Sequence, residues 1–97
     1  MFFEISTMPN STAPTFGLRY RISSPSYTTD WFIDTDGASY SNESLDPAAK
    51  SKGKHYDWEA ALIQASHVKT WLREAGYPNN EVQICQRPSW RVAKKIK

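Results

Sequence analysis

Positive charge is missing from one long stretch of this sequence. Between Arg21 and Lys50 there is no lysine or arginine, and five acidic residues give that stretch a local charge of −5. Residues 50–97 hold ten basic and four acidic residues, a local charge of +6, so the net charge of +2 hides two oppositely charged parts. This asymmetry favours charged partners over a small uncharged substrate.

The sequence also has little cysteine and no long apolar run. Its single cysteine, Cys85, cannot form a disulfide within the chain. No stretch approaches the roughly 18 consecutive apolar residues of a membrane-spanning helix, and residues 1–6 lack the basic residues and apolar core of a secretory signal. We therefore expect a cytoplasmic protein in which residues 1–97 form a single domain.

Alternating side chains predict an antiparallel pair of strands in the first third of the chain. Residues 16–22 alternate between large apolar side chains and small or basic ones, which is typical of a strand with one buried face. Residues 30–34 predict the partner strand, with Trp31 and Ile33 pointing inward, and residues 2–7 predict a third strand.

The second half of the chain predicts one helix followed by further strand. Apolar side chains recur every three or four residues from Asp57 to Ala75, and Gly76 ends the pattern. Residues 81–86 then predict a strand, and residues 89–93 a shorter one.

Two polar segments complete the expected organisation. Residues 38–54 contain few large apolar side chains and predict a long polar loop, and residues 94–97 form a basic tail. The expected fold is α+β, with a small antiparallel β-sheet of three to five strands packed against one main α-helix, in the order β-β-β-α-β(-β).

Catalytic and metal-binding patterns are missing. Cys85 has no nucleophile signature around it, and His55 and His67 have no zinc-ligand spacing. The segment from Asp34 to Gly37 begins like a calcium loop, but the twelfth position holds Leu45 where a bidentate glutamate is needed. We expect no enzyme activity, no cofactor and no bound metal.

The acidic stretch is the first candidate binding surface. On a strand with Trp31 and Ile33 inward, alternate carboxylates share the outer face about 6.6 Å apart, and they resemble the charge track of a nucleic-acid backbone. Such a row fits a basic protein groove built for DNA or RNA, with two loop tyrosines as further contacts. The candidates are Asp30, Asp34, Asp36, Glu43, Asp46, Tyr27 and Tyr40.

A competing interpretation is self-neutralisation across the strands. If Tyr20 pairs with Ile33, then Arg19 lies opposite Asp34, and Arg19 and Arg21 cancel part of the acidic charge.

The basic end of the chain is the second candidate surface. Lysine and arginine beside an aromatic ring are typical of proteins that bind single-stranded nucleic acid or RNA, although no known nucleic-acid motif is present. The residues concerned are Arg87, Trp90, Arg91, Lys94, Lys95 and Lys97.

A small chain with a sheet-plus-helix pattern and the acidic run from Asp30 to Asp46 resembles the small phage-encoded anti-CRISPR inhibitors, some of which imitate DNA. This resemblance implies a stoichiometric, non-enzymatic inhibitor in the cytoplasm of a bacterial host. Its partner would be a protein complex with a basic nucleic-acid-binding groove, namely a CRISPR surveillance complex. Two alternatives stay open: an accessory protein that binds nucleic acid through the basic surface, and a small structural or adaptor domain.

Overall fold

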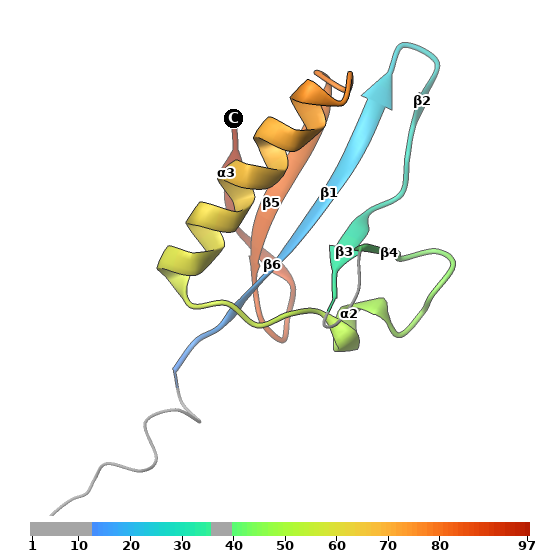
Figure 1. Ribbon diagram of the computed structural model, residues 1–97. Helices are drawn as coiled ribbons and strands as arrows, with labels where there is room; N and C mark the ends of the chain where they lie inside the picture. The colour runs from blue at the N-terminus through green and yellow to red at the C-terminus, as the bar shows by residue number, and fades with distance from the viewer. Residues whose placement is uncertain (1–12, 36–39) are drawn as a thin grey trace, which may run out of the picture.

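A computed structural model describes residues 13–35 and 40–97 of the chain. Its helices and strands follow one another as shown in Figure 1. They are β1 (Phe16–Ser24), β2 (Tyr27–Thr28), β3 (Phe32–Asp34), β4 (Tyr40–Asn42), α2 (Ala49–Lys52), α3 (Trp58–Glu74), β5 (Asn80–Gln86) and β6 (Arg91–Ile96).

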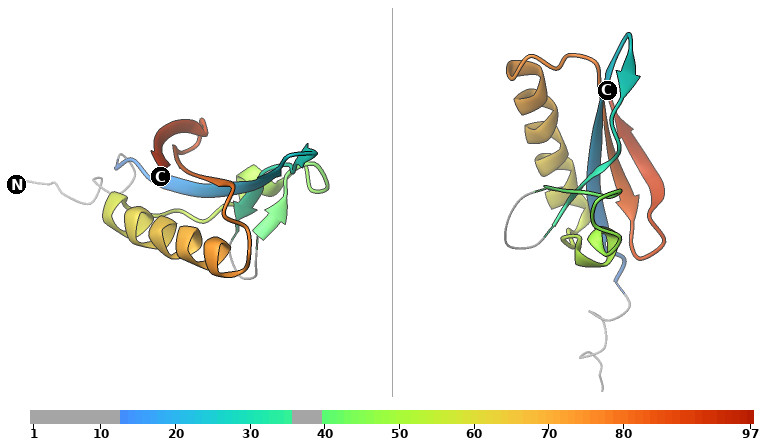
Figure 2. Two further views of the ribbon diagram at one scale, coloured as in Figure 1. Left: turned by 90° about the horizontal axis from the view of Figure 1, so that it is seen from above. Right: turned by 90° about the vertical axis from the view of Figure 1, so that its right-hand side faces the viewer.

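The strands form one six-stranded antiparallel sheet with α3 packed on one of its faces. The order across the sheet is β4-β3-β1-β5-β6, and the short β2 pairs with the end of β1. Figure 2 shows α3 on one side of β1 and β5, while β6 curves on the other side. The predicted α+β fold is confirmed. None of the helices in residues 13–35 and 40–97 is long and apolar enough to cross a membrane.

Strand β1 is central because it pairs with β3 on one side and β5 on the other. Its pairing with β5 runs over seven residue pairs, from Phe16 opposite Gln86 to Ile22 opposite Asn80. The alternation seen in the sequence gives β1 two different faces. Leu18 and Tyr20 lie buried on the α3 side, and Arg19 and Arg21 lie half-buried on the other side.

Helix α3 begins and ends where its capping residues predict. The Asp57 side chain accepts a hydrogen bond of 2.8 Å from the backbone N–H of Ala60, which satisfies one of the free donors of the first turn. Ala75 is the C-cap, and Gly76 follows with a φ of +96°, a backbone conformation that glycine adopts without strain. The helix predicted from Asp57 to Ala75 is confirmed.

The main core fills the space between α3 and the sheet. Ala61, Ala65, Val68 and Leu72 form the buried stripe of α3. They pack with buried side chains of the sheet, namely Leu18, Tyr20, Val82 and Ile84. Trp58, which the periodicity places in this stripe, is instead exposed and touches only its edge through the ring of Phe16, at 4.9 Å between centroids.

A second apolar cluster lies on the opposite face of the sheet. It contains Ile33, Ala49, Cys85 and Trp90, with Trp31 packed against it. The expectation that Trp31 and Ile33 join the core beneath the main helix is therefore wrong. Arg19 pairs with Ile33 and Tyr20 with Phe32, one residue away from the predicted register, so Phe32 takes the place beneath α3.

The Trp90 ring fixes this second cluster by lying directly on two glycines. A Cβ atom on Gly17 would come within 2.6 Å of the ring, and one on Gly53 within 2.9 Å. The Trp90 backbone has a φ of 58°, and its indole N–H donates to the carbonyl of Lys50 at 3.3 Å. Glycine is needed at both contacts because any side chain would displace the ring.

The structure also corrects three segment boundaries. The predicted loop at residues 38–54 contains β4 and α2, and the predicted connection at residues 23–29 contains β2. The last strand runs from Arg91 to Ile96 and takes up most of the predicted basic tail. The strand predicted at residues 2–7 lies outside the described residues.

Truncation of the α3 stripe tests the main core. Leu72 is 1% exposed, so Leu72→Ala should lower the free energy of unfolding by about 2–5 kcal/mol through lost burial and a cavity. Ile63, on the same helix, is 60% exposed, and Ile63→Ala should change stability by less than about 0.5 kcal/mol. Urea denaturation measures both. Equal effects of the two substitutions would contradict the assigned helix face.

The contact between Trp90 and Gly17 predicts a coupled pair of substitutions. Gly17→Ala should destabilise the protein by about 1–3 kcal/mol, because the added methyl group overlaps the Trp90 ring. In a Trp90→Leu background the cost of Gly17→Ala should shrink. Denaturation of the two single variants and the double variant gives the coupling energy, and strictly additive costs would rule out the contact.

Candidate functional site

The predicted acidic row is interrupted at Asp34. Its side chain is only 5% exposed and accepts a hydrogen bond of 2.5 Å from the Tyr56 hydroxyl. Asp34 pairs with Tyr40 on β4, on the α3 side of the sheet. The prediction that Asp34 lies on an outer face is wrong, and so is the predicted placement of Arg19 opposite Asp34, since Arg19 lies opposite Ile33.

The other acidic candidates among the described residues lie outside the strands, in the segments before β3 and after β4. Two of them have lysine partners. Asp30 is exposed and accepts a hydrogen bond from the Ser44 hydroxyl. Glu43 lies 3.8 Å from the Lys50 ammonium group, and Asp46 lies 3.0 Å from that of Lys52. Asp36 lies outside the described residues. These ion pairs cancel much of the negative charge on which backbone imitation depends.

The two candidate tyrosines lie in different surroundings. Tyr27 is exposed on the short strand β2. Tyr40 is half-buried beneath α3, where its ring lies 5.0 Å from that of Tyr20 and 6.3 Å from that of Trp71. They do not form one contact surface with the acidic residues.

Two members of the predicted basic surface have structural roles. Trp90 is the buried ring of the second cluster. The Arg87 guanidinium donates to the backbone carbonyls of Gly53 and Lys54, at 2.8 and 3.1 Å, and its central carbon lies 4.8 Å from the Trp90 ring centroid. Arg87 therefore ties the β5–β6 turn to the segment that precedes α3.

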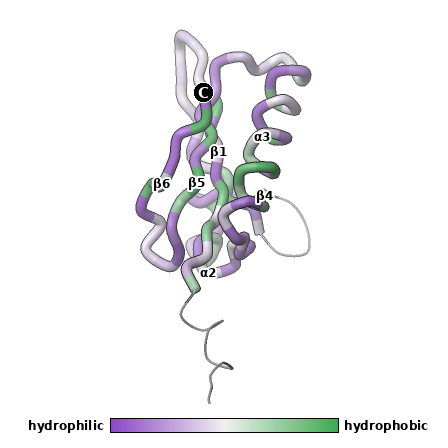
Figure 3. The backbone as a smooth tube through the Cα atoms, turned by 90° about the vertical axis from the view of Figure 1, so that its left-hand side faces the viewer, coloured by the Kyte–Doolittle hydropathy of each residue, from purple (hydrophilic) through white to green (hydrophobic). Residues whose placement is uncertain are grey.

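The remaining basic candidates are exposed along the edge strand β6 and the residue that follows it. Much of β6 has hydrophilic colouring in Figure 3. The exposed cations are Arg91, Lys94, Lys95 and Lys97.

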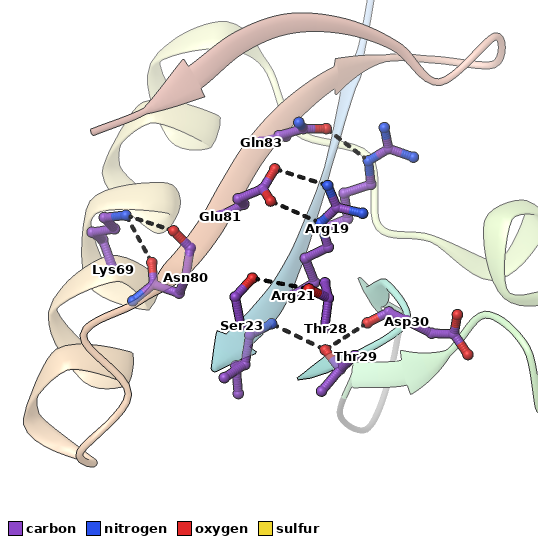
Figure 4. Close-up of polar contacts among 11 residues, drawn as sticks. Arg19, Arg21, Ser23, Thr28, Thr29, Asp30, Lys69, Asn80, Glu81 and Gln83 are labelled. Atoms are coloured by element: carbon purple, nitrogen blue, oxygen red, sulfur yellow. Dashed lines mark hydrogen bonds and ion pairs between the residues drawn. The ribbon is translucent and has the colours of Figure 1, made fainter. Parts of the chain in front are cut away.

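Two further cations extend this surface across the sheet. The guanidinium carbons of Arg19 and Arg21 lie 4.3 and 4.4 Å from the centroid of the Trp31 ring. Arg19 donates to the Gln83 side chain at 3.0 Å, and Arg21 forms an ion pair with Glu81 at 2.9 Å. Figure 4 shows both arginines directed towards β5 on the same side of the sheet. Cation–π and hydrogen-bond contacts hold their guanidinium planes in place.

Strand register places these groups in one line. Gln83 on β5 pairs with Arg19 on β1 and with Lys95 on β6, so the three side chains share a face in neighbouring strands. Arg21 lies in the next row on the same face. We call Arg19, Arg21, Trp31, Gln83 and Lys95 the basic face.

The basic face extends towards α2 and towards the end of α3. Burial raises the pKa of the Cys85 thiol, and the positive charges of Arg19 and Lys50 oppose this rise. On the other side a groove of about 250 Å³ runs between α3, β5 and β6. Its lining includes Glu81, Gln83 and three lysines, Lys69, Lys95 and Lys97.

The sequence of β1 already indicated a basic side of the strand, because its arginines alternate with large apolar side chains. Arg19 and Arg21 occupy the outward positions of the predicted strand. Sequence reasoning did not find this face, because it considered Arg19 only as a partner of Asp34 and both arginines only as charges that cancel the acidic stretch.

The three side chains weighed for catalysis and metal binding, Cys85, His55 and His67, lie on different segments of the described residues. No group of three His, Cys, Asp or Glu side chains there could hold a metal ion. His55 shares a hydrogen bond of 2.9 Å with the Thr15 hydroxyl, and His67 is exposed on α3. The Cys85 thiol is fully buried within the second cluster.

Comparison of the chain with protein-family models, with curated proteins and with solved structures finds no match. Only the arrangement of side chains in this molecule therefore bears on its function.

The ion pair between Asp46 and Lys52 predicts a lowered pKa for the Asp46 carboxyl group, which can be measured. A hydrogen bond from Lys52, followed by one from the backbone N–H of Ala48, lowers the pKa of Asp46 below its usual value. The depressed pKa means that any stability from this carboxylate is present above the usual pKa of aspartate and lost as the pH falls through the lower folded-state value. NMR titration should show this low midpoint, and Lys52→Gln should raise it. An unchanged midpoint in the variant would exclude the pair in solution.

Proposed function

We propose that this protein binds single-stranded nucleic acid through the basic face. The observation that carries this proposal is the line formed by Arg19, Gln83 and Lys95 across three neighbouring strands, with Arg21 in the next row. Neighbouring strands lie about 4.8 Å apart, so Arg19 and Lys95, on either side of the buried Gln83, are separated by two strand spacings, and one extended polyanion can contact both. The protein is a non-enzymatic binding module in this proposal.

Electrostatics supports an anionic partner on this side of the molecule. Lys95 and Lys97 line both the basic face and the adjoining groove, whereas Arg91 and Lys94 alternate onto the other face of β6 and Lys69 donates to Asn80. Glu81 compensates one cation of the basic face, Arg21. A polyanion that neutralises several of these cations releases its own counterions, which drives association.

The aromatic part of the basic face favours a single strand over a duplex. Trp31 holds the planes of Arg19 and Arg21 through cation–π contacts. Guanidinium planes and aromatic rings stack on unpaired bases, which are accessible in a single strand. The long helix α3 covers the opposite side of the sheet, and the helix on this side, α2, is only four residues long, too short to enter a major groove.

The inhibitor interpretation remains a prediction. Burial of Asp34 and the ion pairs of Glu43 and Asp46 weaken its physical basis, which was a continuous row of free carboxylates. In that interpretation Asp30 would contact the basic groove of the partner. Glu43 and Asp46 would do so as well if the partner displaced Lys50 and Lys52 from them.

Binding to fluorescent single-stranded oligonucleotides of mixed sequence, measured by anisotropy at several salt concentrations, tests the proposal. The logarithm of the binding constant should fall linearly with the logarithm of the salt concentration, by about 0.7 for each phosphate contacted. The double substitution Arg19→Gln with Lys95→Gln should raise Kd by about tenfold or more and reduce the slope by about one or more.

The matched control is Lys52→Gln, which removes one positive charge that Asp46 already compensates. It should leave both Kd and slope nearly unchanged. No binding at low salt would overturn the proposal. Capture of a nuclease-resistant protein complex that depends on Asp30 would favour the inhibitor hypothesis instead.

A further inference from the structure

A small groove beside the basic face is lined by three lysines. It lies between α3, the start of β5 and the end of β6, and its volume is about 250 Å³. We call it the lysine groove. Figure 4 shows Lys69 on α3 directed towards Asn80 at the start of β5. The lining used in the argument below consists of Lys69, Asn80, Glu81, Gln83, Lys95 and Lys97.

The lysine groove has an excess of positive charge. Its one carboxylate among the described residues is that of Glu81, whose two oxygens accept hydrogen bonds from Arg21 at 2.9 and 3.2 Å. None of the three lysines forms an ion pair with an aspartate or glutamate of the described residues. The potential in the groove is therefore positive and favours an anionic ligand.

Lys69 is held in place and keeps one donor for a ligand. Its ammonium group donates to the backbone carbonyl and to the side-chain oxygen of Asn80, at 3.3 and 2.7 Å. An ammonium group has three N–H donors, so these two bonds leave one. Burial lowers the pKa of Lys69, and the positive charge of Arg73 lowers it further, while Glu81 opposes both effects. An anion bound in the groove would stabilise the charged form.

The size of the groove and its charge fit a phosphate monoester. Pockets that enclose drug-sized ligands have volumes of about 300–1,000 Å³, so this smaller groove suits a compact anionic group rather than a whole nucleotide. A phosphate monoester carries about 1.5 to 2 negative charges at pH 7 and has three strong acceptor oxygens. Each internal phosphodiester of a nucleic acid carries one negative charge. Three lysines match the larger charge of the monoester.

The lysine groove and the basic face meet at the end of β6. Gln83 and Lys95 belong to the basic face and also line the groove. We propose that the lysine groove binds the terminal phosphate of the single strand that lies on the basic face. The strand in this inference rests on the proposed function, whereas the phosphate site depends on the groove alone. The protein then distinguishes a phosphorylated end from a hydroxyl end.

Adenosine 5′-monophosphate and its phosphate methyl ester test the phosphate site without a strand. They share the nucleoside, and the methyl ester has lost the second negative charge. Titration at constant ionic strength, followed by the backbone NMR signals of Asn80 and Ile96, should show millimolar binding of the monophosphate. The methyl ester should bind at least about threefold more weakly, and adenosine should shift neither signal.

Oligonucleotides with different ends test the strand. Three oligonucleotides of one sequence, each labelled on an internal base, carry a 5′-phosphate, a 3′-phosphate or hydroxyl groups at both ends. Anisotropy at constant ionic strength should give a Kd about threefold or more lower for one of the phosphorylated forms than for the hydroxyl form. The end that is preferred identifies the direction of the strand on the basic face.

Substitution of Lys69 locates the site, because this residue lines the groove and does not belong to the basic face. Lys69→Gln should abolish the preference for the phosphorylated end and leave the Kd of the hydroxyl form within about twofold. Lys69→Arg retains the charge and should retain part of the preference. Lys94→Gln removes the same charge next to Lys95 but outside the groove, so this control should keep the preference. NMR spectra unchanged away from the substitution show that each variant folds.

Three results would overturn the inference. They are equal binding of the phosphorylated and hydroxyl forms, a preference that survives Lys69→Gln, and methyl ester binding as tight as monophosphate binding. Failure of the proposed function looks different, because then no oligonucleotide binds at low salt. In that case the monophosphate titration alone decides whether the groove is a phosphate site.

Discussion

Strict alternation of side chains along β1 is the constraint on which both faces of this molecule depend. Leu18 and Tyr20 point into the core beneath α3, and Gly17, Arg19 and Arg21 point away from it. Strand β1 lies between β3 and β5. Because paired residues point their side chains to the same face of the sheet, the alternation of β1 also determines which side chains of β3 and β5 lie on each face. The core beneath α3 and the basic face therefore come from adjacent residues of a single strand.

Segments with a clear period were predictable from the sequence, and the register between them was not. Residues 16–22 alternate and residues 57–75 repeat at helical spacing, and both became the expected elements. Residues 31–33 are Trp, Phe and Ile, so either phase of alternation buries large apolar groups. The phase adopted turns Asp34 inward, where the Tyr56 hydroxyl, twenty-two residues further along the chain, satisfies its carboxylate.

Tertiary contacts also explain why the candidate sites changed. Segment 38–54 has few large apolar groups, but Ala49 and Gly53 are small enough to lie against Ile33 and Trp90, and this packing orders α2. Once α2 is in place, Lys50 and Lys52 lie beside Glu43 and Asp46. In the sequence these residues belong to an acidic stretch and a basic stretch. In the fold the two carboxylates and the two lysines lie side by side between β4 and the end of α2.

Strand β6 lies at one edge of the sheet. An edge strand exposes unpaired backbone groups to which another chain can add, and proteins often protect such edges with charge. Arg91, Lys94 and Lys95 on β6 place like charges where a second copy would have to align. Repulsion between two such edges discourages extension of the sheet from one molecule to the next. A polyanion that covered these side chains would also remove this repulsion between edges.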